Sequence, residues 1–360
     1  MKIISRYITK ELLIYTLAVM FVWLSVYALF NYIVEAERIG QQNYTALGAM
    51  IYVVLDLPSV AYAHSSVIIL LGSILAIGNL ATSSELIVMR GSGISIMKIS
   101  TIVVRSALLF IAVIILIGEV FAPLSSERAE IYRTQALGQS IYSLNQEGFW
   151  LRDGDNIINV QKNYDGKVFG DVSIFKLNNF NELGSAVFSK KAIFDGENLN
   201  LDETTHNEIN ENSMFTEIQV ENTNKYTEKV NFSNEFISSL KKEPYELSTL
   251  NLYRHITFLN ENKLASGNYE VEFYKRLIKP LTLIAMLLLS MLFIFGSLRS
   301  ATLGKKIFLG VMLSLFFELS SRIGSVISLR LDYDHLLITS LPTLVVLVFS
   351  LLLLYIKSAR

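Results

Sequence analysis

Six long apolar runs constrain this chain more than any other feature of its sequence. Each is nearly uncharged and close to or above the roughly 20 residues that a helix needs to cross a bilayer. The runs are residues 12–34, 57–81, 99–122, 280–298, 307–329 and 336–356. With 52% hydrophobic residues, the chain is too apolar for a soluble protein. We therefore predict an integral membrane α-helical protein with six transmembrane helices, three before and three after a long polar segment.

Basic residues of the short connections gather on one side of this arrangement. They precede the first run, lie in the second-to-third and fourth-to-fifth connections, and follow the sixth run. These residues are Lys2, Arg6, Lys10, Arg90, Lys98, Arg105, Arg299, Lys305, Lys306, Lys357 and Arg360. Short loops rich in Lys and Arg stay in the cytoplasm. Both termini are therefore predicted to be cytoplasmic, and the polar segment is periplasmic in a cell with an outer membrane.

In the polar segment, apolar residues alternate with polar ones over short distances. Leu199 and Leu201 are one such pair, and turn-forming dipeptides such as Asp153-Gly154 and Asp195-Gly196 separate the pairs. This pattern is typical of half-buried strands joined by tight turns. We predict three parts: residues 1–137 with transmembrane helices one to three, an all-β sandwich or roll at 138–247, and residues 248–360. The last part starts with a connecting helix that Ser248 caps and continues with transmembrane helices four to six.

A short polar-capped stretch, TSSELIVMRGSG at residues 82–93, lies between the second and third runs. Thr82 and Glu85 have the spacing of a capping box, which predicts the start of a helix, and two glycines predict its end. The apolar residues 86–89 are too few to cross a bilayer and too apolar to face water alone. Two interpretations stay open from this local pattern: a helix that binds a partner, or a turn packed under the bundle.

The sequence carries no recognisable catalytic motif. It has no cysteine, which excludes disulfides and thiolate ligands, and its four histidines are too scattered to indicate a metal site. A G-x-x-x-x-G-K-[ST] sequence is missing, so the chain does not bind ATP through a P-loop of its own. We therefore predict no catalytic residue, metal or cofactor. The nearly balanced net charge of -1 does not point to nucleic acid.

Two groups of charged residues lie where charge is costly or unexpected. Glu318 and Arg322 stand four residues apart in the fifth run, either as a functional intramembrane pair or as an arginine that snorkels to the interface with its counter-ion. The second group lies at the outer ends of the third and fourth runs and comprises Arg128, Arg133, Lys275, Arg276 and Lys279. These residues either attract anionic lipid head groups or belong to an ordinary solvated loop with interspersed acids.

Several motifs resemble those of the LptF/LptG family of lipopolysaccharide export permeases. The most specific are SELIVMRGSG at residues 84–93, IGEVFAP at 117–123, YRTQA at 132–136 and FIFGSLRS at 293–300. YTALGAMIY at residues 44–52 is a weaker match. The resemblance covers nearly the full length, in the order of the spans and the place of the β domain. FIFGSLRS and the residues around Glu85 favour the LptG branch over the LptF branch.

The resemblance implies a permease subunit of an ABC transporter that extracts lipopolysaccharide from the bacterial inner membrane and passes it to a periplasmic bridge toward the outer membrane. The implied partners are the paralogous permease LptF in a heterodimer, a dimer of the ATPase LptB, LptC, lipopolysaccharide and the membrane. The chain itself is then no enzyme, and its β domain is a periplasmic jellyroll. Two alternatives stay open: a permease of another ABC exporter, and a membrane-anchored sensor or structural protein without a transport role.

The resemblance also implies roles for particular residues. Residues 82–93 become the coupling helix that binds the ATPase through Glu85, Leu86, Met89 and Arg90. Spans one and five line the lipid cavity. The implied lipid-binding residues are Tyr27, Phe30, Arg38, Arg133, Leu313, Phe316, Phe317 and Arg322. Asn31 and Glu37 replace family lysines and Glu130 replaces another basic residue. Phosphate recognition is therefore expected to be shared differently, or the lipid carries less phosphate.

Overall fold

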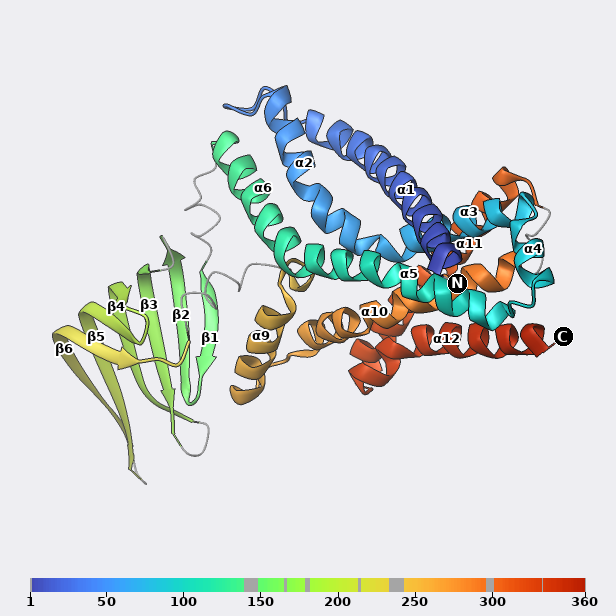
Figure 1. Cartoon of the computed structure of the whole chain (residues 1–360). Coiled ribbons are helices and arrows are strands. Elements are labelled where there is room, and N and C mark those ends of the chain that lie inside the picture. The colour runs from blue at the N-terminus through green and yellow to red at the C-terminus, as the bar shows by residue number, and fades with distance from the viewer. Residues whose placement is uncertain are drawn as a thin grey trace.

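The chain folds into a helical membrane unit with an inserted sheet (Figure 1). A computed structural model describes residues 2–138, 148–164, 167–178, 182–212, 215–232, 243–295, 301–331 and 333–359. Seven helices within these ranges are long and apolar enough to cross a membrane. The predicted fold class, a helical membrane protein with an inserted all-β domain, is confirmed. The end of the FIFGSLRS motif, residues 296–300, lies outside the described ranges.

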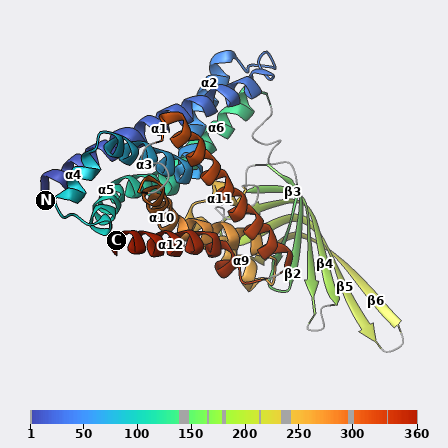
Figure 2. The ribbon, with the colours of Figure 1, turned by 90° about the vertical axis from the view of Figure 1, so that its right-hand side faces the viewer.

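The helices before the sheet are α1 (Lys2–Ala36), α2 (Ala46–Ala63), α3 (Ser65–Thr82), α4 (Glu85–Gly91), α5 (Ile96–Leu116), the π-helical turn η1 (Ile117–Phe121) and α6 (Ala122–Ala136). The helical elements after it are the 3-10 turn η2 (Pro244–Glu246), α9 (Thr249–Glu261), α10 (Gly267–Ile294), α11 (Leu303–Leu331) and α12 (His335–Ala359). Ser248 caps α9 as predicted, since its hydroxyl accepts the N–H of Asn251. Both termini and α4 lie at the end of the helical unit away from the sheet (Figures 1 and 2).

Two predicted spans have different boundaries in the structure. The run at residues 57–81 is divided at His64 into α2 and α3, and α2 begins earlier, at Ala46. The third run continues through η1 into α6, which gives one continuous helical stretch of 41 residues, Ile96–Ala136. α2 packs against α6 beyond the rest of the bundle (Figure 1). Because α2 and α3 are separate helices, seven rather than six satisfy the criteria of length and composition. The six-crossing topology stays a prediction.

Helix α3 is the centre of the membrane unit. It is apolar on all sides, and a helix of this kind is stable only when it is surrounded. Its residues Ile68, Leu70 and Ile74 are fully buried, and it packs against α1, α10 and α11. Gly72 allows the close approach of α1, because a Cβ there would lie 2.6 Å from the backbone of Thr16. The cavity described below therefore has a rigid helix beside it.

Within the described residues the sheet has six strands: β1 (Phe149–Asp153), β2 (Asn156–Asn163), β3 (Val168–Leu177), β4 (Leu183–Phe194), β5 (Asn198–Asn212) and β6 (Phe215–Lys229). All neighbours are antiparallel, and the order in the sheet is the order in the chain. The predicted turns at Asp153-Gly154 and Asp195-Gly196 join β1 to β2 and β4 to β5, and both glycines have positive φ. The described part of the predicted roll is thus one up-and-down sheet.

Two residues with positive φ, one in β3 and one in β5, interrupt the regular backbone of the sheet. Asp171 of β3 and Glu203 of β5 have φ of 50° and 52°, a region that non-glycine residues rarely enter. The alternation of buried side chains changes there, since Leu199 and Leu201 are buried before Glu203 and Thr204 after it. Such irregularities increase the twist and curvature of strands. One continuous apolar face results, and Phe258 of α9 packs on it together with the buried Phe194. Helix α9 therefore joins the sheet to the membrane unit.

Candidate functional site: a polar-walled membrane cavity

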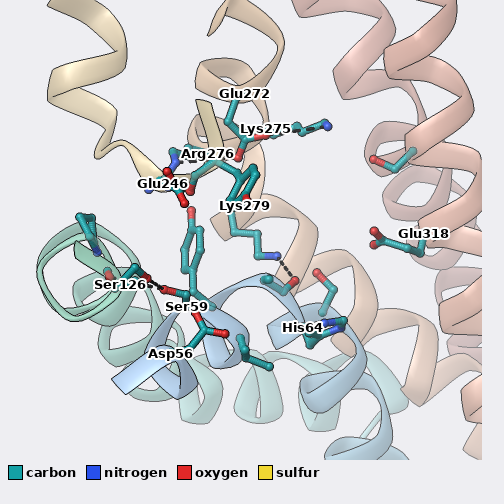
Figure 3. Close-up of a pocket in the computed structure, with 18 of the residues that line it drawn as sticks. Asp56, Ser59, His64, Ser126, Glu246, Glu272, Lys275, Arg276, Lys279 and Glu318 are labelled. Carbon is teal, nitrogen blue, oxygen red and sulfur yellow. Dashed lines mark hydrogen bonds and ion pairs between the residues drawn. The ribbon is translucent and has the colours of Figure 1, made fainter. Parts of the chain in front are cut away.

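A cavity of about 750 Å³ opens among α1, α2, α6, α10, α11 and α12. Its wall includes three of the predicted lipid-binding residues, Tyr27, Phe317 and Arg322. Titratable side chains line it from several helices, as Figure 3 shows for Asp56, His64, Glu272, Lys279 and Glu318. Apolar and charged groups therefore face the same space, which is the chemistry that a large amphiphile requires.

Helix α10 brings Lys279 to the break between α2 and α3. The Lys279 ammonium donates a hydrogen bond to the carbonyl of Ala63 at 3.1 Å and lies 5.3 Å from the centre of the Tyr62 ring. Carbonyls at the end of a helix lack partners within that helix. Lys279 thus satisfies the end of α2 and holds a positive charge at the cavity wall, opposite Glu318 of α11 (Figure 3).

Glu318 and Arg322 form the predicted ion pair on α11. Nε of Arg322 lies 3.1 Å from Oε1 of Glu318, and the two side chains are 71% and 46% exposed in this chain. Both residues line the cavity. The pair is therefore confirmed as a contact, and its exposure leaves most of the five guanidinium N–H donors available to a ligand.

The predicted basic residues Arg38 and Arg133 meet outside the cavity lining, at the C-terminal end of α1. Both contact Oε1 of Glu35, at 3.2 Å and 3.3 Å, and Arg133 also contacts Glu130 at 2.7 Å. Glu35 itself is buried. We name Glu35, Arg38, Glu130 and Arg133 the outer charge cluster. Its two positive and two negative charges balance, so it holds the arginines in place without excess charge.

Tyr44 completes the support of Glu35. Its hydroxyl donates to the second oxygen of Glu35 at 2.9 Å, and burial together with this hydrogen bond raises the pKa of Tyr44. The phenol therefore stays a neutral donor. Glu35 was not predicted from the sequence, because it stands between Val34 and Ala36 in α1 and no local pattern marks it. The YTALGAMIY motif, which contains Tyr44, was the available hint.

The remaining predicted lipid-binding residues lie on helix surfaces. Phe30 of α1 and Phe316 of α11 are exposed and point away from the core of this chain. Leu313 is partly buried against the hydrophobic core of the helical unit, here called the main core. The cavity thus gathers only some of the predicted set, and exposed apolar faces of α1 and α11 flank it.

The predicted capping box at residues 82–85 is wrong. The Thr82 hydroxyl donates to carbonyls of its own helix α3, at Gly78 and Asn79. Ser84 takes the N-cap position of α4 with φ of 63° and no side-chain cap. The helix α3 continues through Thr82, so this residue ends one helix instead of starting the next. Glu85 instead accepts hydrogen bonds from Tyr7 of α1, at 3.3 Å, and from Ser83, at 3.0 Å.

Helix α4 divides the predicted coupling residues between two faces. Leu86 is buried and Met89 packs against the main core, whereas Arg90 is exposed with Ile87 and Val88. The interpretation as a turn packed under the bundle therefore holds for one face. The other face is exposed in this chain, and its binding to a partner stays a prediction. Within the described residues no group of three or more His, Asp or Glu is arranged to hold a metal ion.

Similarity to known proteins extends over nearly the full length of the chain. The family model "Lipopolysaccharide export system permease LptF/LptG" matches residues 6–356. The lipopolysaccharide export system permease protein LptG of Escherichia coli K12 is 28% identical over 359 residues, which cover 99% of each chain. The LptG protein of Haemophilus influenzae is 28% identical over 323 residues, 89% of each chain. With its long apolar helices and inserted sheet, the chain is a multi-pass inner-membrane protein that belongs to the lipopolysaccharide export system permease LptF/LptG family.

Proposed function

We propose that this chain is the LptG-type permease subunit of an ABC transporter that extracts lipopolysaccharide from the inner membrane and passes it to a periplasmic bridge. The observation that carries the proposal is the polar-walled cavity beside α1 and α11. Lipopolysaccharide combines several acyl chains with a charged head group, so it needs apolar contact and charge in one site. ATP hydrolysis belongs to a separate subunit, because the chain has no P-loop.

The proposed partners are the paralogous permease LptF, an LptB ATPase dimer and LptC. A paralogue would cover the exposed faces of α1 and α11, where Phe30 and Phe316 lie. Large exposed apolar faces flanking a cavity favour a partner or lipid over water. Copurification in mild detergent tests this assembly: an ATPase subunit should accompany the chain. Its absence would favour a membrane-anchored sensor.

Lipid contact is tested by replacing single residues with a photo-reactive amino acid. Positions 30 and 317 should crosslink to lipopolysaccharide, because one lies on the face of α1 that flanks the cavity and the other lines the cavity. Phe349, exposed on α12 and outside the cavity lining, is a matched aromatic control. Equal crosslinking at 349 and 317 would mean that the lipid is only solvating the bundle.

We propose that Arg38 and Arg133 of the outer charge cluster orient the lipid phosphates above the cavity. Each arginine is partly solvated, so each should contribute roughly 1 kcal/mol. Single alanine variants are therefore expected to be nearly silent, whereas Arg38→Ala with Arg133→Ala should reduce transport and lipopolysaccharide crosslinking from position 30. Normal transport in the double variant would leave the cavity in place and remove the cluster from the lipid site.

We propose that α4 couples the ATPase to the permease through Glu85 and Arg90, with Leu86 and Met89 supporting the helix from below. Glu85→Ala should uncouple ATP hydrolysis from transport, because an acidic contact at a partner groove is lost. Tyr7→Phe is the control: it removes the hydrogen bond within the chain and keeps the carboxylate. If Tyr7→Phe and Glu85→Ala are equally defective, Glu85 acts within this chain and not on the ATPase.

The proposed topology places both termini in the cytoplasm and the sheet in the periplasm. The chain has no native thiol, so a single cysteine at Ser185 of β4 reports its side of the membrane cleanly. It should react with an impermeant reagent from the periplasm. Reaction only from the cytoplasm would overturn the topology.

A further inference from the structure

The π-helical turn η1 lies where the membrane unit meets the segment that leads back from the sheet. A π-turn carries one extra residue per turn and changes the direction of the following helix. Gly118 is essential to its packing, because a Cβ there would lie 2.1 Å from the ring of Tyr62. The turn therefore packs closely against Tyr62 of α2, and the next residue is Glu119.

Glu119 binds the first residue of α9. Its two oxygens accept the backbone N–H of Thr249 at 2.9 Å and the Thr249 hydroxyl at 2.7 Å. A carboxylate at a helix N-terminus satisfies an orphan N–H and interacts favourably with the helix dipole. Glu119 is therefore a capping group supplied to α9 from a residue 130 positions earlier in the chain.

Arg276 of α10 stabilises the contact between Glu119 and Thr249. Its guanidinium contacts Glu119 at 3.2 Å, the carbonyl of Gly118 at 3.3 Å and the carbonyl of Tyr245 in η2 at 2.9 Å. The side chain is 3% exposed and lies 5.2 Å from the centre of the Tyr62 ring. A buried arginine with this many fixed acceptors cannot move independently of them. We name Glu119, Thr249 and Arg276 the η1 joint.

The far end of α9 is fixed to the sheet in the same way. Phe258 belongs to the core of the sheet, and the side-chain oxygen of Asn262 accepts the N–H of Gly154, in the β1–β2 turn, at 2.7 Å. A continuous path of packed and hydrogen-bonded groups therefore runs from α5 and α10 through Glu119 and α9 into β1. Coupling between distant parts of a protein needs such a contiguous network.

We propose that Glu119 is a positioning residue: the η1 joint fixes the sheet relative to the membrane cavity and passes helix movement to it, so that lipid leaves the cavity toward the sheet. This inference rests on the proposed function. It assigns a role to IGEVFAP, since Gly118 allows the close packing of the turn and Glu119 makes the connection. No lipid contact is required of Glu119, which lies outside the cavity lining.

The test uses Glu119→Gln, which keeps the size of the side chain and removes its charge, in the full chain in lipid nanodiscs. Spin labels at Arg128 of α6 and Asn222 of β6 report the position of the sheet. Labels at Leu47 of α2 and Arg128 report the membrane unit alone. In Glu119→Gln, the distance distribution between 128 and 222 should broaden, and that between 47 and 128 should stay narrow. Glu37→Gln, the same change at an exposed position, should alter neither.

Lipopolysaccharide crosslinking and delivery are measured on the same variants. Glu119→Gln should keep lipopolysaccharide crosslinking at position 317 and lose delivery to the outer membrane. Thr249→Val, which removes only the hydroxyl contact, is the milder second variant and should show the same pattern to a smaller degree. A narrow 128–222 distribution in both variants, or normal delivery despite broadening, would overturn the inference. If position 317 does not crosslink even in the chain that keeps Glu119 and Thr249, the proposed function would be overturned instead.

Discussion

The chain contains two Glu-x-x-x-Arg pairs that look alike in sequence and differ in the structure. Glu318 and Arg322 of α11 are 3.1 Å apart, and Arg322 is 71% exposed. In α10, Glu272 lies 3.9 Å from Arg276, which is 3% exposed and contacts Glu119 of η1 at 3.2 Å. The same spacing therefore gives a local surface pair in one helix and a connection between distant segments in the other.

The difference follows from what covers each helix. The Tyr62 ring of α2 and the carbonyl of Tyr245 cover the Arg276 side chain of α10. Because water cannot reach the guanidinium, Arg276 needs acceptors inside the protein. Helix α11 has no such cover over Arg322 in this chain, and a solvated guanidinium loses little when one partner is removed. A buried arginine thus stabilises one arrangement, and an exposed arginine stays available for binding.

The largest effect is expected from removing the buried arginine. Arg276→Met should lower the free energy of unfolding by about 3 kcal/mol, because Glu119 loses its partner in a half-buried site. Arg322→Met should change it by less than about 1 kcal/mol. Denaturation in mixed detergent micelles, followed by helical circular dichroism, measures both variants. Equal losses would remove the distinction between the two pairs.

A glycine substitution tests the packing under Arg276. Gly118→Ala should destabilise by about 1–3 kcal/mol, because its Cβ would collide with the Tyr62 ring. An alanine in an unconstrained helical position would instead stabilise by up to about 1 kcal/mol. In a chain that already carries Tyr62→Ala, Gly118→Ala should lower the free energy of unfolding by less than it does in the unmodified chain, because the ring with which its Cβ collides is absent. Additive losses in the double variant would show that the two residues do not restrict each other.

The exposed pair is expected to act on binding. Glu318→Gln removes the counter-ion of Arg322, so lipopolysaccharide crosslinking at position 317 should rise, by a factor that corresponds to less than about 1 kcal/mol. Arg322→Gln should lower it by a similar amount. Titrating salt distinguishes a charge effect from a shape effect, because exposed ion pairs are screened. Identical changes in both variants would mean that the pair acts as one polar group.

The smallest effect concerns another buried basic side chain, His255 of α9, which stacks on Tyr269 at 5.0 Å. Unlike Arg276, it can release its proton, and burial lowers the pKa of His255. In the unfolded chain the pKa of a histidine is about 6.5. Below that pH the folded protein binds fewer protons than the unfolded chain, so its free energy of unfolding should fall as the pH drops. Unfolding at pH 7.5 and 5.5 should show a smaller difference in His255→Gln than in the unmodified chain. An unchanged difference would assign the acid sensitivity to other groups.

Local patterns in the sequence were sufficient for most of the fold. Apolar length predicted the membrane helices, and alternation with Asp-Gly turns predicted strands such as β4 and β5. Ser248 was identified as a cap because a cap depends on neighbouring residues only. The same reasoning failed at Thr82, where two helices follow each other closely and the local pattern does not show which helix the threonine belongs to. The break at His64 was missed because both sides of it are apolar.

The sequence by itself determined that the chain spans a membrane, carries an inserted sheet and resembles a permease family, because apolar length, alternation and motifs are properties of consecutive residues. Only the tertiary structure decided which charges far apart in the sequence meet. Arg133 reaches Glu35 across 98 positions and Arg276 reaches Glu119 across 157. Such contacts depend on how helices pack, and rotating a helix by one residue, about 100°, would redirect every side chain involved. The roles of Arg276 and Arg322 were therefore fixed by their neighbours in space, since burial determines whether a charge must be paired within the protein.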